Sequence, residues 1–352
     1  MFKCLPDLAA IDNRRLKLRL VLAALLFGML GTTAAVAANS AVILMYHRFG
    51  EDGYPSTNIR LEQFEEHIAE LKSGGYTVLP LPEINAALNE GRSLPDRTVA
   101  ITIDDAYRSV FTEAFPRLEA AGFPFTLFVA TLPIDRGAKG YMNWDQIRAL
   151  RDAGATIGSQ THSHPHMPLL GSAENLRDLE TSNRRFEKEL RKPPVFFAYP
   201  YGEASSAVIS MVREQGFVAA FGQHSGVVHR SSDRHYLPRF ALNESYGDLK
   251  RFRLIANALP LPVSEITPSD PQVRQNPPAF GFTVAPSVSG LHRLSCYRSS
   301  EGKLKFERLG AQRIEVRFDK PFAPGRTRIN CTMPGQDGRW RWFGMQFYVK
   351  PG

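Results

Sequence analysis

The chain has 352 residues, of which 43% are hydrophobic and 22% are charged, and its formal net charge is +8 at neutral pH. This length is sufficient for two domains, and the composition is that of a globular protein rather than a disordered or fibrous one. The basic residues form no stripe with interleaved aromatic residues, so the sequence predicts no nucleic-acid partner.

Residues 1–37 have the features of a secretory signal peptide. Basic residues between Arg14 and Arg19 precede the apolar run Leu20–Leu30, and small residues ending at Ala37 follow it. The run is short for a membrane span, so we expect no stable span after cleavage. The mature protein is predicted to be periplasmic or secreted, with an uncleaved N-terminal anchor as the alternative.

From about residue 41 to residue 255, short apolar runs alternate with amphipathic stretches. Strands are predicted at Ala41–Tyr46, Thr77–Leu79, Val99–Ile103, Phe125–Ala130, Thr156–Gly158, Val195–Tyr199 and Val218–Phe221. Helices are predicted at Leu61–Gly74, Pro82–Asn89, Ser109–Ala121, Trp144–Ala153, Ala173–Leu190 and Ser205–Gln215. This alternation indicates an α/β fold whose parallel strands form a barrel or an open sheet.

Two adjacent carboxylates, Asp104 and Asp105, end the strand predicted at Val99–Ile103. Neighbouring side chains on a strand point to opposite faces, so tandem acids fit the carboxyl end of a strand better than its interior. At that end, one acid can hold a metal ion while the other moves a proton. A turn with two solvated acids is the alternative that the pair alone would favour.

Three of the nine histidines, His162, His164 and His166, lie within five positions. Imidazole is the commonest side-chain ligand for zinc and similar ions, so this cluster predicts a metal site, with a histidine-rich surface loop as the alternative. A further segment, Tyr199-Pro200-Tyr201-Gly202, follows a predicted strand and would by itself be an ordinary turn.

Together with Ile43–His47, these segments resemble the motifs of the polysaccharide deacetylases with a NodB-type domain, carbohydrate esterase family 4, over about residues 41–245. The family's motifs are Thr-Phe-Asp-Asp-Gly, His-(Ser/Thr)-x-x-His and Arg-x-x-Pro-Tyr, in the same order. The resemblance implies an incomplete (β/α) barrel. It also implies a metal-dependent hydrolase that removes N-acetyl groups from an extracytoplasmic amino-sugar polysaccharide. An O-acetyl esterase, another amide hydrolase, or a carbohydrate-binding protein with a degenerate site are the alternatives.

The resemblance also implies roles for single residues. Asp105 would bind a divalent metal ion, with zinc favoured, and Asp104 would be the general base. Tyr201 matches the tyrosine whose backbone N–H stabilises the oxyanion. The literal motif fits His162 and His166, whereas the flanking residues place Gln160 and His164 at the ligand positions. We favour His164 and leave open whether Gln160, His162 or His166 joins it.

Two further positions depart from the family pattern. Ala198 stands where the family has an arginine, so the buried charge network around the base is expected to be missing or rebuilt. The late segment Leu237–Phe240 lacks the family's histidine, so His224 is our candidate for the general acid and His235 is second. His47 is a candidate for a supporting or substrate-contacting role, and packing is the alternative.

The C-terminal part has a different pattern. Residues 259–280 contain six prolines and are predicted to be a linker between a deacetylase domain at 38–258 and a small β-sandwich at 281–352. The sandwich strands are predicted at Leu291–Tyr297, Lys303–Arg308, Arg313–Phe318, Arg326–Met333 and Trp342–Val349. Cys296 and Cys331 are predicted to form a disulfide if the protein is exported. Trp340 and Trp342 are either core residues or a sugar-stacking surface.

Overall fold

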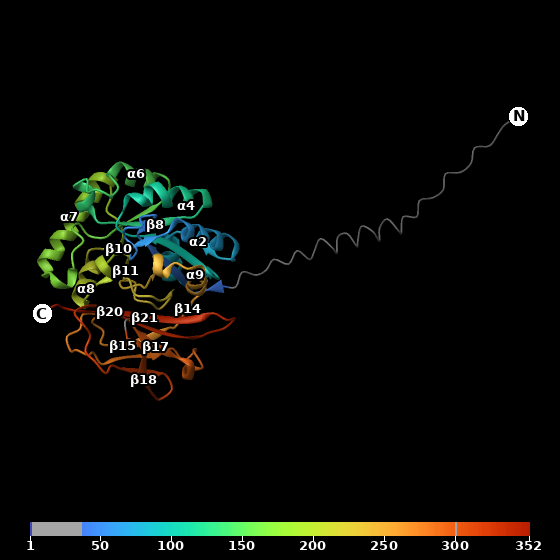
Figure 1. Ribbon diagram of the computed structural model, residues 1–352, viewed down its shortest axis with the longest axis vertical. Coiled ribbons are helices and arrows are strands. Elements are labelled where there is room, and N and C mark those ends of the chain that lie inside the picture. The colour runs from blue at the N-terminus through green and yellow to red at the C-terminus, as the bar shows by residue number, and fades with distance from the viewer. Residues whose placement is uncertain (2–36, 300) are drawn as a thin grey trace. The chain divides into compact units, whose positions relative to one another are not determined.

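The computed structural model describes Met1, residues 37–299 and residues 301–352 (Figure 1). The predicted signal peptide and the alternative membrane anchor therefore lie outside the described residues, apart from Met1 and Ala37. In the described part of the chain, no helix is both long enough and apolar enough to cross a membrane. Residues 37–352 form one compact unit.

A curled sheet forms the centre of the N-terminal part, in the order β11-β10-β9-β8-β7-β2 with all of these strands parallel. These strands are β2 (Ser40–Tyr46), β7 (Thr98–Ile103), β8 (Phe125–Val129), β9 (Thr156–Ser159), β10 (Phe196–Ala198) and β11 (Ala219–Phe221). The short strands β5 (Thr77–Val78), β12 (Val228–His229) and β13 (Phe240–Ala241) join the same sheet. The predicted incomplete (β/α) barrel is confirmed.

The segment 237–241 connects the two edges of this curled sheet. Leu237 forms a parallel bridge with Phe221 of β11, and three residues later β13 begins to pair with β2. Residues between these two contacts therefore pass across the gap between the first and last strands. This route carries Arg239 to the carboxyl end of β7, where Asp104 and Asp105 lie.

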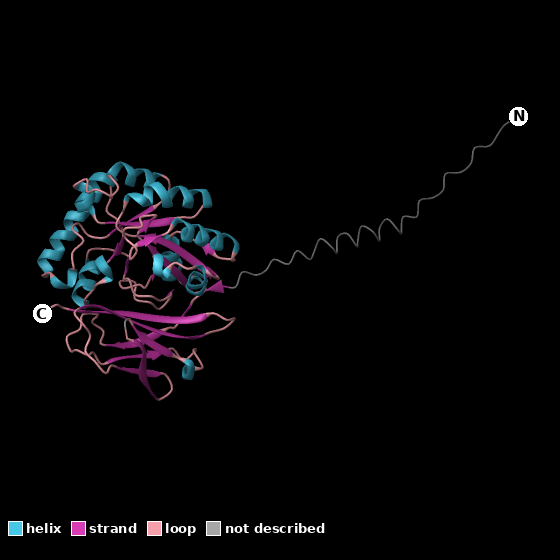
Figure 2. Cartoon of the chain, in the orientation of Figure 1, coloured by secondary structure: helices cyan, strands magenta, loops and turns pink. Residues whose placement is uncertain are grey.

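Helices surround the sheet (Figure 2). They are α2 (Leu61–Ser73), α3 (Leu81–Glu90), α4 (Phe115–Ala121), α5 (Thr131–Asp135), α6 (Trp144–Asp152), α7 (Ser172–Leu190), α8 (Ser206–Glu214) and α9 (Leu249–Ala256). The predicted helix at Ser109–Ala121 divides into a π-helical turn, Val110–Ala114, and α4. Helix α9 was not predicted. Every residue of β7 is buried, which explains its continuous apolar sequence.

The C-terminal part is a sheet of eight strands in the order β14-β21-β20-β17-β18-β19-β16-β15. The prediction that this part is all-β is confirmed. The strands are β14 (Leu259–Pro260), β15 (Val263–Thr267), β16 (Phe280–Val284), β17 (Ser295–Arg298), β18 (Gly302–Leu309), β19 (Arg313–Arg317), β20 (Gly325–Pro334) and β21 (Trp340–Val349). Phe282 of β16 packs on Phe343 of β21 with ring centroids 5.0 Å apart, although four strands separate them in the sheet. The sheet is therefore folded over its own aromatic core.

Two details differ from the predicted pattern. Residues 259–267, within the segment predicted to be a linker, contribute β14 and β15 to this sheet; the domain boundaries themselves stay a prediction. The predicted strand Leu291–Tyr297 begins with a short 3₁₀ turn, Leu291–Arg293, before β17. Trp342 is half-buried and packs edge-on against Phe240 of β13, whereas Trp340 is 38% exposed.

Cys296 and Cys331 form the predicted disulfide, opposite each other on β17 and β20. Replacing both with alanine is expected to lower the free energy of unfolding of the C-terminal sheet by about 3–4 kcal/mol, because the bond closes a loop of some 35 residues. Hydrogen exchange resolved by segment would measure the effect. Strands β17 and β20 should lose protection while β7 to β9 keep theirs, and equal loss in both sets would contradict a disulfide effect confined to the C-terminal sheet.

Candidate active site

The carboxyl ends of β7, β9 and β10 meet at one end of the barrel, and the backbone there is unusual. Among residues 37–299 and 301–352, nine non-glycine residues have positive φ, and five of them lie in the loops that follow these strands. They are Asp105, Ala106, Thr161, His164 and Tyr201, with φ between 56° and 74°. Left-handed backbone at residues other than glycine costs free energy and concentrates at functional sites. The three predicted motifs therefore lie where left-handed backbone at non-glycine residues is concentrated.

A cavity of about 380 Å³ lies at this end of the barrel. Its lining includes His47, Asp105, Tyr107, Tyr141, His164, Tyr201 and Arg326. The structure thus brings together three of the predicted site residues, Asp105, His164 and Tyr201, from three different loops. It also places His47 in the same wall.

Asp105 and His164 form the charged centre of the cavity. Oδ1 of Asp105 lies 3.4 Å from Nε2 of His164, and the ring of His164 contacts the edge of the Tyr201 ring. Burial by itself would raise the pKa of Asp105, but its hydrogen bond with His164 and the charge of His47 lower that pKa to about 2. Asp105 is therefore an anion that faces the cavity.

Asp104 has a different environment from its neighbour. Its side chain is fully buried, and the guanidinium of Arg239 donates to both carboxylate oxygens, at 2.7 and 2.8 Å. Arg239 is itself fully buried and also donates to Oγ1 of Thr102 and to the Gly222 carbonyl. This bidentate ion pair fixes both oxygens of Asp104. A charge network around Asp104 is therefore present, and its arginine comes from the segment 237–241 instead of position 198.

The remaining two histidines of the cluster point away from Asp105. Nδ1 of His162 lies 2.7 Å from Oγ1 of Thr131. Nδ1 of His166 lies 2.7 Å from Oε2 of Glu203, and its ring stacks on Tyr201 with centroids 4.2 Å apart. Of the two possible ligand sets, the structure brings together the one with Gln160 and His164.

A divalent ion at this site would find an incomplete set of strong ligands. A catalytic zinc ion takes about three protein ligands, and in the described residues no group of three or more His, Cys, Asp or Glu side chains could hold a metal ion. Gln160 is fully buried beside the Asp105–His164 pair; its Oε1 accepts a bond of 3.2 Å from the Asp105 N–H, and its Nε2 has no partner. The described residues therefore offer an ion at this site one carboxylate and one imidazole, with the amide of Gln160 beside them.

The candidates for the general acid lie in different places. His224 is buried and lines another cavity, of about 330 Å³, together with Tyr236 and Trp342. Burial lowers the pKa of His224 to about 3, and the charges of Arg328 and Arg239 add to this effect. Nε2 of His235 lies 2.9 Å from the Phe217 carbonyl oxygen. The structure brings neither histidine to the cavity with Asp105, whereas Nε2 of His47 lies there, 3.9 Å from Oδ2 of Asp104.

The sequence analysis did not identify two contributions to the site. The first is Arg239, although the segment 237–240 was recognised as the late motif. The second comes from the C-terminal sheet: Arg326 of β20 and Gln346 of β21 donate to the Tyr201 carbonyl at 3.4 and 3.2 Å. No local sequence pattern connects residues that lie 125 and 145 positions apart.

Comparisons with known proteins point to one family. Residues 91–220 match the family model described as polysaccharide deacetylase. A poly-beta-1,6-N-acetyl-D-glucosamine N-deacetylase of Staphylococcus aureus (strain MSSA476) is 24% identical over 234 residues, which cover 58% of this chain and 80% of the relative.

Two solved structures have the same fold. IcaB from Ammonifex degensii is 25% identical with a TM-score of 0.56, and the match covers 63% of this chain and 98% of that one. The Streptococcus pyogenes deacetylase PplD in complex with acetate is 19% identical with a TM-score of 0.55, covering 59% and 94%. Over residues 91–220 the chain therefore matches the polysaccharide deacetylases, hydrolases that act on the carbon–nitrogen bonds of amides.

Proposed function

We propose that this chain removes N-acetyl groups from an amino-sugar polysaccharide outside the cytoplasm. The observation that carries the proposal is the separation of the two adjacent acids. Asp104 is buried in an ion pair with Arg239, while Asp105 faces a cavity together with His164. The N-terminal segment Arg14–Ala37, with its signal-peptide pattern, supports the location, and the poly-N-acetylglucosamine deacetylases among the relatives support the substrate class.

Asp105, His164 and Gln160 would hold a divalent ion, with zinc favoured. When bound, such an ion polarises an acyl carbonyl and lowers the pKa of a water molecule. An imidazole and a carboxylate suit zinc, and the amide oxygen of Gln160 is a neutral ligand that weakens the site relative to a second histidine. We therefore expect metal to be bound, but less tightly than by a site with two histidines.

The remaining steps belong to the chain's own side chains. Asp104 would accept the proton of the attacking water, and its bidentate bond to Arg239 holds it in one orientation. His47, beside Asp104 in the cavity wall, would donate a proton to the leaving amine. The backbone N–H of Tyr201 would stabilise the oxyanion, and its carbonyl is fixed by Arg326 and Gln346. We accordingly transfer the acid role proposed for His224 to His47.

One observation favours a second candidate function. Gln160 replaces a charged or titratable ligand, and its Nε2 is buried without a partner. A site weakened in this way could bind the acetylated sugar without hydrolysing it. The chain would then be a carbohydrate-binding protein on a deacetylase fold.

Acetate release from an N-acetylglucosamine oligomer tests the proposal. We expect turnover in the metal-loaded protein, and a loss of about 10²–10⁴-fold in kcat with little change in KM for Asp104→Asn, because that variant replaces the base by an amide of nearly the same size. Asp319→Asn, an exposed acid of the C-terminal sheet, is the matched control. Acetate from O-acetylated but not N-acetylated oligomers would show an esterase instead, and binding without any release would show a binding protein.

A further inference from the structure

A second cavity, of about 480 Å³, adjoins the catalytic one. Its lining includes His166, Glu203, Arg326, Arg328 and Tyr348. Arg326 lines both cavities, and Tyr201 lies at the boundary, with its ring stacked on His166 and in edge contact with His164. A polymer bound with one sugar in the catalytic cavity would therefore place a neighbouring unit here.

Positive charge exceeds negative charge in this lining. Arg326 and Arg328 are two positions apart on β20, so their side chains leave the same face of the strand. Glu203 is the acid among these lining residues, and its carboxylate is already engaged: Oε2 lies 2.7 Å from His166, and Oε1 lies 3.6 Å from Nε of Arg326. In the described part of the chain, Arg328 has no ion pair; its Nε donates to Oε1 of Gln346.

The positive charges of the Arg326 and Arg328 guanidinium groups also repel each other. Burial lowers the pKa of Arg328, and the charge of Arg326 lowers it further. An anion bound between Arg326 and Arg328 would reduce the repulsion between their charges. It would also supply the hydrogen bonds that each guanidinium loses when it is buried away from water. A carboxylate is suited to such a place, because a guanidinium presents its N–H donors in a fork that matches two carboxylate oxygens.

We propose that this cavity is a subsite for an acidic sugar unit, a uronic acid carboxylate next to the N-acetylated sugar. The inference rests on the proposed function and narrows its substrate to an acidic heteropolysaccharide. A free anion such as phosphate shares the same chemistry. The sugar unit is preferred because the subsite adjoins the catalytic cavity through Arg326.

Calorimetric binding to the full chain tests the subsite without depending on turnover. We compare, in the Asp104→Asn background, a neutral N-acetylglucosamine oligomer with an alternating uronate–N-acetylglucosamine oligomer of equal length. The acidic oligomer is expected to bind about tenfold more tightly at low salt, and the difference should shrink at high salt. Arg328→Gln should abolish the preference, while Arg328→Lys, which keeps the charge, should retain part of it.

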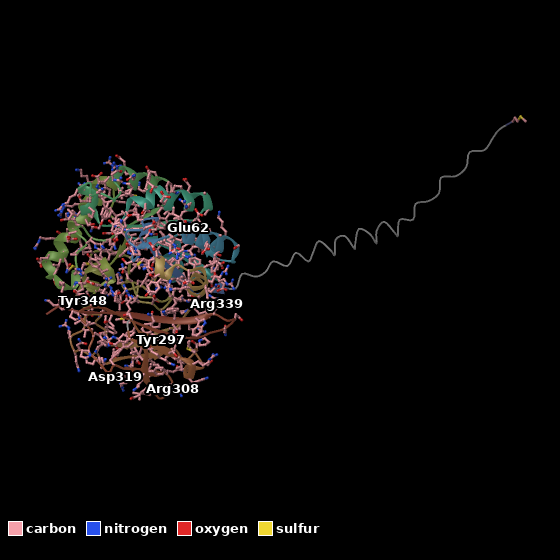
Figure 3. All side chains as sticks on the ribbon, in the orientation of Figure 1. Glu62, Tyr297, Arg308, Asp319, Arg339 and Tyr348 are labelled. Atoms are coloured by element: carbon pink, nitrogen blue, oxygen red, sulfur yellow. A yellow bond between two sulfur atoms is a disulfide. The ribbon has the colours of Figure 1, made fainter. Side chains whose placement is uncertain are left out.

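Arg308→Gln is the matched control, because Arg308 is an exposed residue of β18 that lies on the opposite side of the C-terminal part from Tyr348 (Figure 3). It should keep the full preference. Equal affinity for the two oligomers, or no binding of either, would overturn the subsite, as would tight binding of inorganic phosphate with no preference between oligomers. Acetate release from the neutral oligomer by the unmodified chain is scored separately, so the proposed function can stand when the subsite fails.

Discussion

Replacing Arg239 with alanine is expected to lower the free energy of unfolding by about 3–5 kcal/mol and to remove most of the turnover. The substitution leaves the Asp104 carboxylate fully buried with neither of its two guanidinium bonds. Removing one partner of a buried ion pair is costly because the other charge stays desolvated and uncompensated. The same loss frees Asp104 to rotate, which would misplace the proposed base.

Combining Arg239→Ala with Asp104→Asn separates these two effects. The double variant no longer buries an unpaired charge, so its unfolding free energy should exceed that of Arg239→Ala alone, while its turnover stays at the level of Asp104→Asn. Urea unfolding and acetate release are measured on all four proteins of the cycle. Arg251→Ala is a control, since Arg251 is half-buried and, among the described residues, its guanidinium donates to backbone carbonyls rather than to a carboxylate. Additive losses in the double variant would contradict a direct Arg239–Asp104 coupling.

The sequence alone predicted the strands that carry the three motifs, and the physical reason for this success is simple. Each motif directly follows a short apolar run, and parallel strands place their carboxyl ends at one edge, so Asp105, His164 and Tyr201 were expected to meet. Position along the chain was sufficient because all three lie within a few residues of a strand end. The partner of Asp104 does not follow this rule. Ala198 occupies the expected place, and Arg239 arrives through a bridging segment that pairs with both β11 and β2.

The contribution of the C-terminal sheet to the site could not be predicted from the sequence, for a different reason. The alternation of apolar and polar residues predicted strands at 326–333 and 342–349. Such a pattern indicates which face of the sheet a residue occupies, but it does not indicate which loop packs on that face. Arg326 and Gln346 contact the Tyr201 carbonyl because the C-terminal sheet packs against the loop that follows β10. The strand at 280–284, at the start of the predicted sandwich, was missed because it follows a proline-rich stretch; its Phe282 packs in the aromatic core.

Replacing Gln160 with histidine is expected to tighten zinc binding by at least about tenfold, a typical effect of altering one group of a metal site. The amide of Gln160 is buried beside the Asp105–His164 pair, so an imidazole there would give the site a third strong ligand. Competition with a chromogenic chelator measures the affinity directly and needs no activity. An unchanged affinity would place the metal elsewhere.

Removal of single ligands should give the complementary result. Asp105→Ala and His164→Ala are expected to lose bound metal after dialysis, because a site with only two strong donors cannot spare one, whereas Asp104→Asn should keep it. His162→Ala is the matched control: its ring belongs to the same cluster but faces Thr131. Metal content by mass spectrometry distinguishes the outcomes. If His162→Ala lost metal and His164→Ala kept it, the other histidine pair would hold the ion, and the assignment of Gln160 and His164 would be wrong.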